Sequence, residues 1–342
     1  MKAAVYKGHG KMDVDEVPTP QPGAREILVK VQACGICGTD VHIFEGAEGA
    51  AATVPPVILG HEFSGVVEQV GAEVRGIRVG DRVSVDPNTL CGCCSFCKAG
   101  LGHFCEQMIG YGTTTDGGFA QYCVVPYQQA YRLADHISFE EGALCEPVAC
   151  CLHGIDLCEI KAGSTVMVIG GGTIGLIMVQ LAKISGASKV ILIEPVTEKR
   201  ALGLKVGADW AIDPQHEDVE ALLKEQKIDR IEAVIECVGL KRTMLDAIKY
   251  AGKKSVVMFF GLGNPDDEIP VKPFELFKKE ITLKASFINP YTQARAVELI
   301  NSGRIDVKSL VTQSISLEEL REALASPEKR RGCKTVVNPW QI

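Results

Sequence analysis

The chain has 342 residues, 46% of them apolar, and a formal net charge of −7. This length favours two domains, and the absence of a basic stripe argues against nucleic acid as a partner. No apolar run reaches the roughly 18 residues of a membrane span, and the N-terminus does not resemble a signal peptide, so we expect a cytoplasmic protein with no membrane partner.

The first 150 residues favour β-structure. Short β-branched runs alternate with turns rich in glycine and proline, and such runs are typical of strands. They predict strands at residues 1–6, 27–31, 65–70 and 82–85. The pattern indicates an all-β-leaning domain with a twisted, barrel-like sheet.

The pattern changes near residue 160, where apolar runs begin to alternate with helical segments. Strands are predicted at residues 166–169, 190–193, 211–212, 233–235, 255–259 and 281–283, and helices at 174–183 and 219–224. This alternation predicts a parallel sheet with helices on both faces. Beyond residue 289 we expect helices over 294–301 and 317–325, and a last strand over 334–337 that rejoins the first domain.

A glycine-rich turn at residues 170–175 fits the pattern G-x-G-x-x-G. It follows a buried strand and opens a helix, and Glu194 ends the next strand, which is the context that a dinucleotide-binding fingerprint requires. The helix N-terminus would offer its N–H groups to the phosphates. Cofactor contacts are expected at Gly170, Gly172, Ile174, Gly175, Glu194, Lys199, Gly261 and Leu262.

Glu194 indicates which dinucleotide is preferred. Its carboxylate would accept hydrogen bonds from the adenosine ribose hydroxyls and would repel a 2′-phosphate, so the sequence favours NAD over NADP. Lys199 and Arg200 would favour NADP if they faced the ribose, although a solvated helix face is the simpler interpretation.

Four of the 14 cysteines form a C-x2-C-x2-C-x7-C pattern in a glycine-rich loop. Four closely spaced thiolates can enclose one tetrahedral zinc with no open position, which is a structural site. An iron–sulfur cluster uses similar ligands, and disulfides are disfavoured in a long cytosolic chain. The ligands predicted for the structural zinc are Cys91, Cys94, Cys97 and Cys105, with Cys93 as a bystander.

A second metal site is predicted from Cys37, His61, Glu62 and Glu146. One thiolate, one imidazole and one or two carboxylates leave zinc an open position, where it can lower the pKa of an alcohol that then gives a hydride to nicotinamide. A single Cys or His is more often core filler than a ligand, and Cys34 with Cys37 also reads as a C-x-x-C redox motif.

The chain resembles the zinc-containing medium-chain dehydrogenase/reductase superfamily, and its sorbitol (polyol) and threonine dehydrogenase branch matches best. The resemblance rests on these segments: Cys37-Gly38-Thr39-Asp40-Val41-His42, Gly60-His61-Glu62, the four-cysteine lobe, Asp116-Gly117-Gly118-Phe119-Ala120, Cys145-Glu146-Pro147 and the glycine turn. Their order and separation match over nearly the full length.

The resemblance implies a fold and a set of residue roles. The fold is α/β plus β: a GroES-like catalytic domain (residues 1–155 and 290–342) with an inserted Rossmann domain (residues 156–289), a doubly wound parallel sheet. Cys37 and His61 would bind the catalytic zinc, with Glu62 and Glu146 as carboxylate ligands. Thr39 and His42 would relay the proton. One catalytic and one structural zinc per chain, NAD, and a homodimer or homotetramer are expected.

Two departures from sorbitol dehydrogenases bear on the substrate. Ile43 and Ile288 stand where those enzymes have a tyrosine and an arginine that contact the polyol. We therefore expect a secondary alcohol of the polyol or sugar-alcohol class, but not necessarily sorbitol. Threonine 3-dehydrogenase activity is the alternative, but that family has a histidine shortly before the cysteine lobe, and residues 86–89 of this chain contain none. A non-catalytic binding member is a second alternative.

Overall fold

The computed structural model describes residues 1–47, 52–330 and 332–341. The chain divides into two compact units, one formed by Met1–Ala149 with Ile288–Ile342 and the other by Cys150–Phe287. Helix α4 (Cys145–Leu157) crosses the first of these boundaries. Within the described ranges, no helix is both long and apolar enough to cross a membrane.

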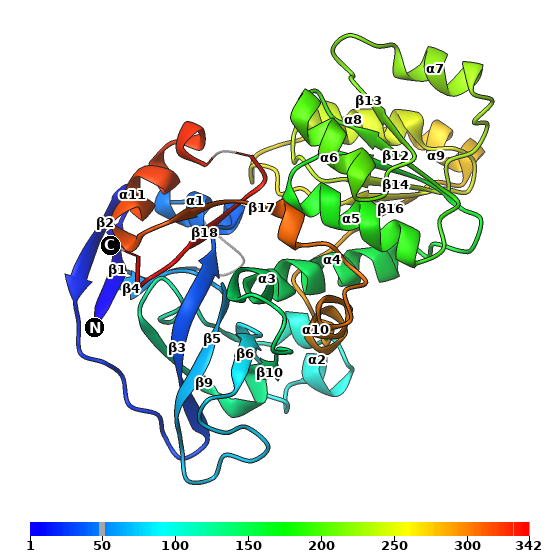
Figure 1. The fold of residues 1–342 in the computed structure, drawn as a ribbon. Helices are drawn as coiled ribbons and strands as arrows, with labels where there is room; N and C mark the ends of the chain where they lie inside the picture. Colours follow the sequence, from blue (N-terminus) through cyan, green and yellow to red (C-terminus); the bar gives the residue numbers. More distant parts are fainter. Residues whose placement is uncertain (48–51, 331, 342) are drawn as a thin grey trace. The chain divides into compact units, whose positions relative to one another are not determined.

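The first unit is built on a sheet of seven described strands (Figure 1). Strands β10, β6, β5, β3, β18 and β17 are neighbours in this order, and β9 also pairs with β3. Their bounds are β3 (Glu26–Gly35), β5 (Glu62–Val70), β6 (Arg82–Val85), β9 (Tyr122–Pro126), β10 (Ala130–Arg132), β17 (Val311–Ile315) and β18 (Lys334–Val337). A smaller sheet contains β1 (Lys2–Gly8), β2 (Lys11–Glu16) and β4 (Val57–Ile58), and a two-stranded ribbon contains β7 (Asn88–Thr89) and β8 (Ile109–Gly110).

The long antiparallel pair β3–β5 is central to this sheet. Its β-branched side chains suit the pleated surface, and Ile27, Val67 and Phe63 are fully buried. Strand β18 runs antiparallel to β3, with Val336 opposite Gly35. The prediction that the last strand rejoins the first domain is therefore confirmed.

The first unit also carries short helices around these sheets. They are α1 (Gly38–Phe44), α2 (Ser95–Lys98), α3 (Phe139–Ala143), α10 (Gln293–Asn301) and α11 (Leu317–Ala325). Helix α1 is not evident from apolar spacing, but Asp40 explains where it begins, because its carboxylate accepts a hydrogen bond from the Cys37 N–H at 2.8 Å. This helix carries the predicted relay residues Thr39 and His42, and the predicted metal ligand Cys37 directly precedes it.

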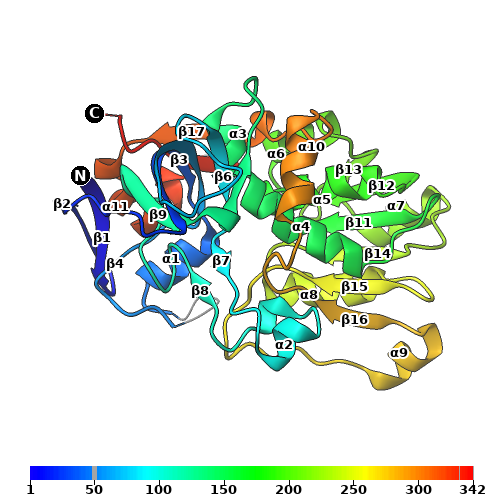
Figure 2. The same cartoon turned by 90° about the horizontal axis from the view of Figure 1, so that it is seen from below.

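The second unit is a parallel sheet in the order β13-β12-β11-β14-β15-β16, which can be followed in Figure 2. The strands are β11 (Thr165–Ile169), β12 (Lys189–Ile193), β13 (Trp210–Ile212), β14 (Ala233–Glu236), β15 (Val256–Phe259) and β16 (Thr282–Ala285). The helices are α5 (Thr173–Ile184), α6 (Thr197–Lys205), α7 (Val219–Glu225), α8 (Lys241–Tyr250) and α9 (Pro273–Lys279). The strand order reverses between β11 and β14, which is where doubly wound sheets bind ligands.

The predicted parallel sheet is confirmed, and each of its six predicted strands overlaps an observed one. Helices α6, α8 and α9 occupy helical segments that the alternating pattern predicts between the strands. The interior of α6 contains Gly203, which weakens helical propensity, but the Leu192 side chain lies so close to Gly203 that a larger residue would collide with it. Packing against β12 therefore favours glycine at position 203, although glycine has a low helix propensity.

Candidate metal and cofactor sites

The ligand atoms of Cys37, His61 and Glu62 all lie within 4.8 Å of one another. Cys37 precedes α1, whereas His61 and Glu62 lie at the start of β5, and the β3–β5 register that sets Glu62 opposite Gly35 brings the segments together. Gly60 has φ 93°, and a Cβ there would lie 2.8 Å from the Cys34 sulfur and the Phe119 ring. Glycine therefore permits the tight turn that delivers His61.

Asp40 faces the imidazole of this cluster. Its fully buried carboxylate Oδ1 lies 3.4 Å from His61 Nδ1, which leaves Nε2 as the nitrogen available to a metal. Burial opposes protonation of His61, but the facing Asp40 and Cys37 outweigh it and raise the pKa of His61 well above its usual value. Sequence analysis assigned no role to Asp40.

Glu62 has a buried cationic partner that sequence analysis also missed. Lys334 of β18 forms an ion pair with Glu62, and its Nζ donates to Ile36 O at 2.9 Å. The pKa of Lys334 is raised because Glu62 and Cys37 outweigh the effect of burial. The available signal was a lysine at the first position of a strand that was predicted to rejoin the first domain.

The donor set of this cluster fits zinc. One thiolate, one imidazole and one carboxylate leave room for a further ligand, as catalytic zinc sites require. Glu146 is buried in the first turn of α4 but lies outside this group of three, so its role as a ligand stays a prediction.

The proposed relay residues lie on α1 beside the cluster. Thr39 Oγ1 is 3.7 Å from Cys37 Sγ, and His42 follows one helical turn later with a partly exposed side chain. Ile43 is buried in the core of the first unit, at 2% exposure. A side chain in that position packs the domain and presents no polar group to a substrate.

The four predicted cysteines of the lobe come together. The sulfur atoms of Cys91, Cys94, Cys97 and Cys105 lie within 4.8 Å of one another, and the Cys91–Cys97 separation of 3.9 Å excludes a disulfide between these two. The N–H groups of Cys93 and Cys94 donate to Cys91 Sγ and lower the pKa of that thiol to about 6. Backbone support for a thiolate suits a structural zinc, while Cys93 is exposed and outside the cluster.

The glycine turn of the second unit has the geometry that the fingerprint predicts. Gly170 has φ 101°, and a side chain at Gly175 would collide with the Gly170 carbonyl, so both positions require glycine. Gly172 caps α5 and faces open space, which leaves the backbone accessible. A phosphate could therefore approach the helix N-terminus.

Glu194 directly follows β12 and lies beside this turn. Its carboxylate accepts hydrogen bonds from Gly171 N at 2.6 Å and Val196 N at 2.8 Å. Gly261 and Leu262 follow β15, and Lys199 lies half-buried on α6. The structure brings Glu194 to the glycine turn, while contacts of Lys199, Gly261 and Leu262 with a cofactor stay predictions.

Family comparisons agree with this geometry. Residues 23–135 match the alcohol dehydrogenase GroES-like domain, and residues 173–302 match the zinc-binding dehydrogenase domain. D-arabinitol dehydrogenase 1 from Uromyces fabae is 33% identical, over 99% of this chain and 97% of its own length. L-threonine 3-dehydrogenase from Pyrococcus furiosus is 37% identical, over 87% of this chain and 86% of its own.

Solved structures extend the comparison to the fold. A zinc-binding dehydrogenase from Sinorhizobium meliloti 1021, crystallised with NADP, is 40% identical and superposes with a TM-score of 0.94, over 99% of both chains. Full-length similarity at this level accompanies both domain matches, which confirms the expected GroES-like and Rossmann architecture. The chain therefore belongs to the zinc-containing medium-chain dehydrogenase/reductase superfamily, in its polyol dehydrogenase branch.

Proposed function

We propose that this protein is a zinc-dependent, NAD-linked dehydrogenase that interconverts a secondary alcohol of the polyol or sugar-alcohol class and its ketone. The observation that carries the proposal is the convergence of Cys37, His61 and Glu62 within 4.8 Å. When bound, zinc would act as a Lewis acid on the alcohol oxygen, and NAD would accept the hydride.

The residues around the zinc ligands would tune and orient them. Asp40, whose Oδ1 faces His61 Nδ1, would orient the His61 ring, and Lys334 would balance the charge of Glu62 in a buried setting. Glu62 and Glu146 are the two carboxylates proposed as zinc ligands. Which of the two is the resting ligand is a matter for metal-site spectroscopy on Glu62→Gln and Glu146→Gln.

Thr39 and His42 would carry the alcohol proton to water. A threonine hydroxyl can donate and accept at once, and imidazole titrates near neutral pH. Thr39 lies in the first turn of α1 and His42 one turn later, and the proposed metal ligand Cys37 directly precedes the helix. A short helix could therefore keep Thr39 and His42 at a fixed position relative to the metal ligand Cys37.

Glu194 supports NAD as the cofactor. A buried carboxylate at the end of β12 disfavours a 2′-phosphate by charge repulsion. The Sinorhizobium meliloti relative was crystallised with NADP, so direct titration of both cofactors is the test for this chain. We expect kcat/KM to be higher with NAD, and Glu194→Ala to reduce the difference.

A substrate panel tests the proposal as a whole. Zinc-loaded protein would be assayed by NADH absorbance with secondary alcohols, polyols, polyol phosphates and L-threonine. We expect the highest kcat/KM with a polyol or secondary alcohol. The similarity to the Pyrococcus furiosus enzyme makes threonine the specific alternative; a kcat/KM highest for L-threonine would replace our proposal, and turnover of none would favour a binding role.

A further inference from the structure

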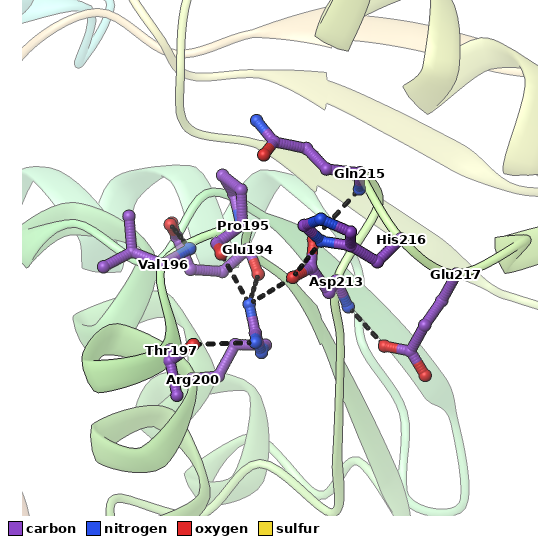
Figure 3. Close-up of polar contacts among 9 residues, drawn as sticks. All are labelled: Glu194, Pro195, Val196, Thr197, Arg200, Asp213, Gln215, His216 and Glu217. Carbon is purple, nitrogen blue, oxygen red and sulfur yellow. Dashed lines mark hydrogen bonds and ion pairs between the residues drawn. The ribbon is translucent and has the colours of Figure 1, made fainter.

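The guanidinium of Arg200 lies close to Glu194, at the proposed cofactor site, and donates to several acceptors (Figure 3). Its Nη1 donates to Glu194 O at 2.9 Å and to Pro195 O at 2.6 Å, and Nη2 donates to Thr197 Oγ1 at 3.1 Å. Nη1 also lies 3.1 Å from Asp213 Oδ2, and the side chain is only 18% exposed. The guanidinium thus binds the main chain of the turn that carries Glu194.

Asp213 supplies the one carboxylate among these four partners. It follows β13, and the parallel register of Ile193 with Ile212 places it beside Glu194 at the carboxyl ends of adjacent strands. Nearby groups fix its position, since Oδ1 accepts from Gln215 N at 3.0 Å and its own N–H donates to Glu217 Oε2 at 2.8 Å.

The charged surroundings keep Asp213 ionised. The Gln215 N–H, together with His216 and Arg200, lowers the pKa of Asp213 and outweighs the effect of burial. His216 Nδ1 lies 3.1 Å from Oδ2, on the same oxygen that faces Arg200. The Arg200–Asp213 pair is therefore charged on both sides at neutral pH.

We infer that Asp213 is a specificity-determining positioning residue for the dinucleotide. By holding Arg200 against the Glu194–Thr197 turn, it withholds a guanidinium that could otherwise neutralise a 2′-phosphate near Glu194. Arginine is well suited to such a phosphate because its donors match the oxygens in pairs. The inference rests on the proposed NAD site at Glu194, and it assigns discrimination to a residue one strand away.

The test measures binding of the adenosine end alone, without turnover. ADP and adenosine 2′,5′-bisphosphate would be titrated calorimetrically into the wild type, Asp213→Asn and Glu217→Gln. Asparagine keeps an acceptor for Gln215 N but removes the charge that holds Arg200. We expect Asp213→Asn to bind the 2′-phosphorylated probe about tenfold more tightly, in line with one charge-assisted hydrogen bond, and ADP within about twofold of wild type.

Two controls distinguish loss of the Asp213–Arg200 ion pair from a general change of charge. Glu217→Gln removes one negative charge from the same loop without touching Arg200, so its ratio of affinities should match the wild type. In the double variant Asp213→Asn/Arg200→Gln, the gain in affinity for the 2′-phosphorylated probe should disappear. A gain that persists without Arg200, or that also appears in Glu217→Gln, would overturn the inference.

The same titrations distinguish this inference from the proposed function. Wild-type protein that binds the 2′-phosphorylated probe more tightly than ADP would overturn the NAD preference. If Asp213→Asn has the wild-type melting temperature and the wild-type ratio of affinities for the 2′-phosphorylated probe and ADP, the role of Asp213 is overturned. The NAD preference would not be affected by that result. Should Asp213→Asn fold poorly, Asp213→Ser, which retains a hydroxyl acceptor, gives the same readout.

Discussion

The two proposed metal clusters of this protein, one structural and one catalytic, are built in opposite ways. The lobe draws four cysteines from residues 91–105, and main-chain N–H groups donate to the sulfurs of Cys91, Cys94 and Cys105. The catalytic cluster joins Cys37 to His61 and Glu62, and charged side chains from α1 and β18 surround it. One site is local in sequence, whereas the other depends on how three strands pair.

This difference predicts different consequences for substitution. A local site that uses only thiolates can lose its metal without altering the sheet, because its support is its own loop. The catalytic cluster contains buried charges that compensate one another, so a change there affects ligation and stability together. Substitutions in the two clusters can therefore be compared directly.

The largest effect is expected at the catalytic cluster. Cys37→Ala or His61→Ala should lower kcat by at least about 10³-fold, since Lewis-acid catalysis supplies several kcal/mol. NADH binding, measured by fluorescence titration, should remain within about twofold because the glycine turn is untouched. The matched control is Cys123→Ala, a buried thiol outside both clusters. Full activity in either ligand variant would contradict the assignment.

The lobe should respond in metal content and stability. Cys94→Ser is expected to reduce zinc from about two per chain to about one, because each cluster is proposed to hold one ion. The melting temperature should fall, since binding of structural zinc contributes to folding. Cys93→Ser is the neighbouring control and should keep both ions. Unchanged zinc in Cys94→Ser, measured by mass spectrometry, would mean that the lobe is not a metal site.

The buried ion pair should give a smaller effect that is specific to the catalytic cluster. Lys334→Met leaves Glu62 without its cation and should cost about 3–5 kcal/mol in urea unfolding. Lys334→Met/Glu62→Gln should recover much of this loss, because no buried charge is then unpaired. If the double variant is as unstable as the single one, packing of the lysine stem, and not charge, is what stabilises the site.

The proton relay should show the smallest effect. His42→Ala is expected to slow alcohol oxidation about tenfold at low pH, less than the usual general-base range because water can replace the last relay member. The loss should shrink as pH rises and hydroxide takes over, and imidazole buffer should restore part of the rate. If the loss of oxidation rate in His42→Ala does not change with pH and does not respond to imidazole, His42 is not the proton acceptor and Glu146 is the next candidate.

The sequence alone determined those features whose residues are close together in the chain. The C-x2-C-x2-C-x7-C lobe, the glycine turn at 170–175 and the alternating strands of the second unit are local patterns with a local physical meaning. The residue types suggested Cys37, His61 and Glu62 as ligands of one metal, and the resemblance to a family supported this set.

Tertiary structure decided the partners of those residues. Lys334 reaches Glu62 only because β18 pairs with β3 from the far end of the chain, and Asp213 reaches Arg200 only because β13 lies beside β12. Charge compensation across strands depends on register and burial, which no window of sequence contains. The sequence therefore determined which groups could do chemistry, and the fold decided which charges hold them in place.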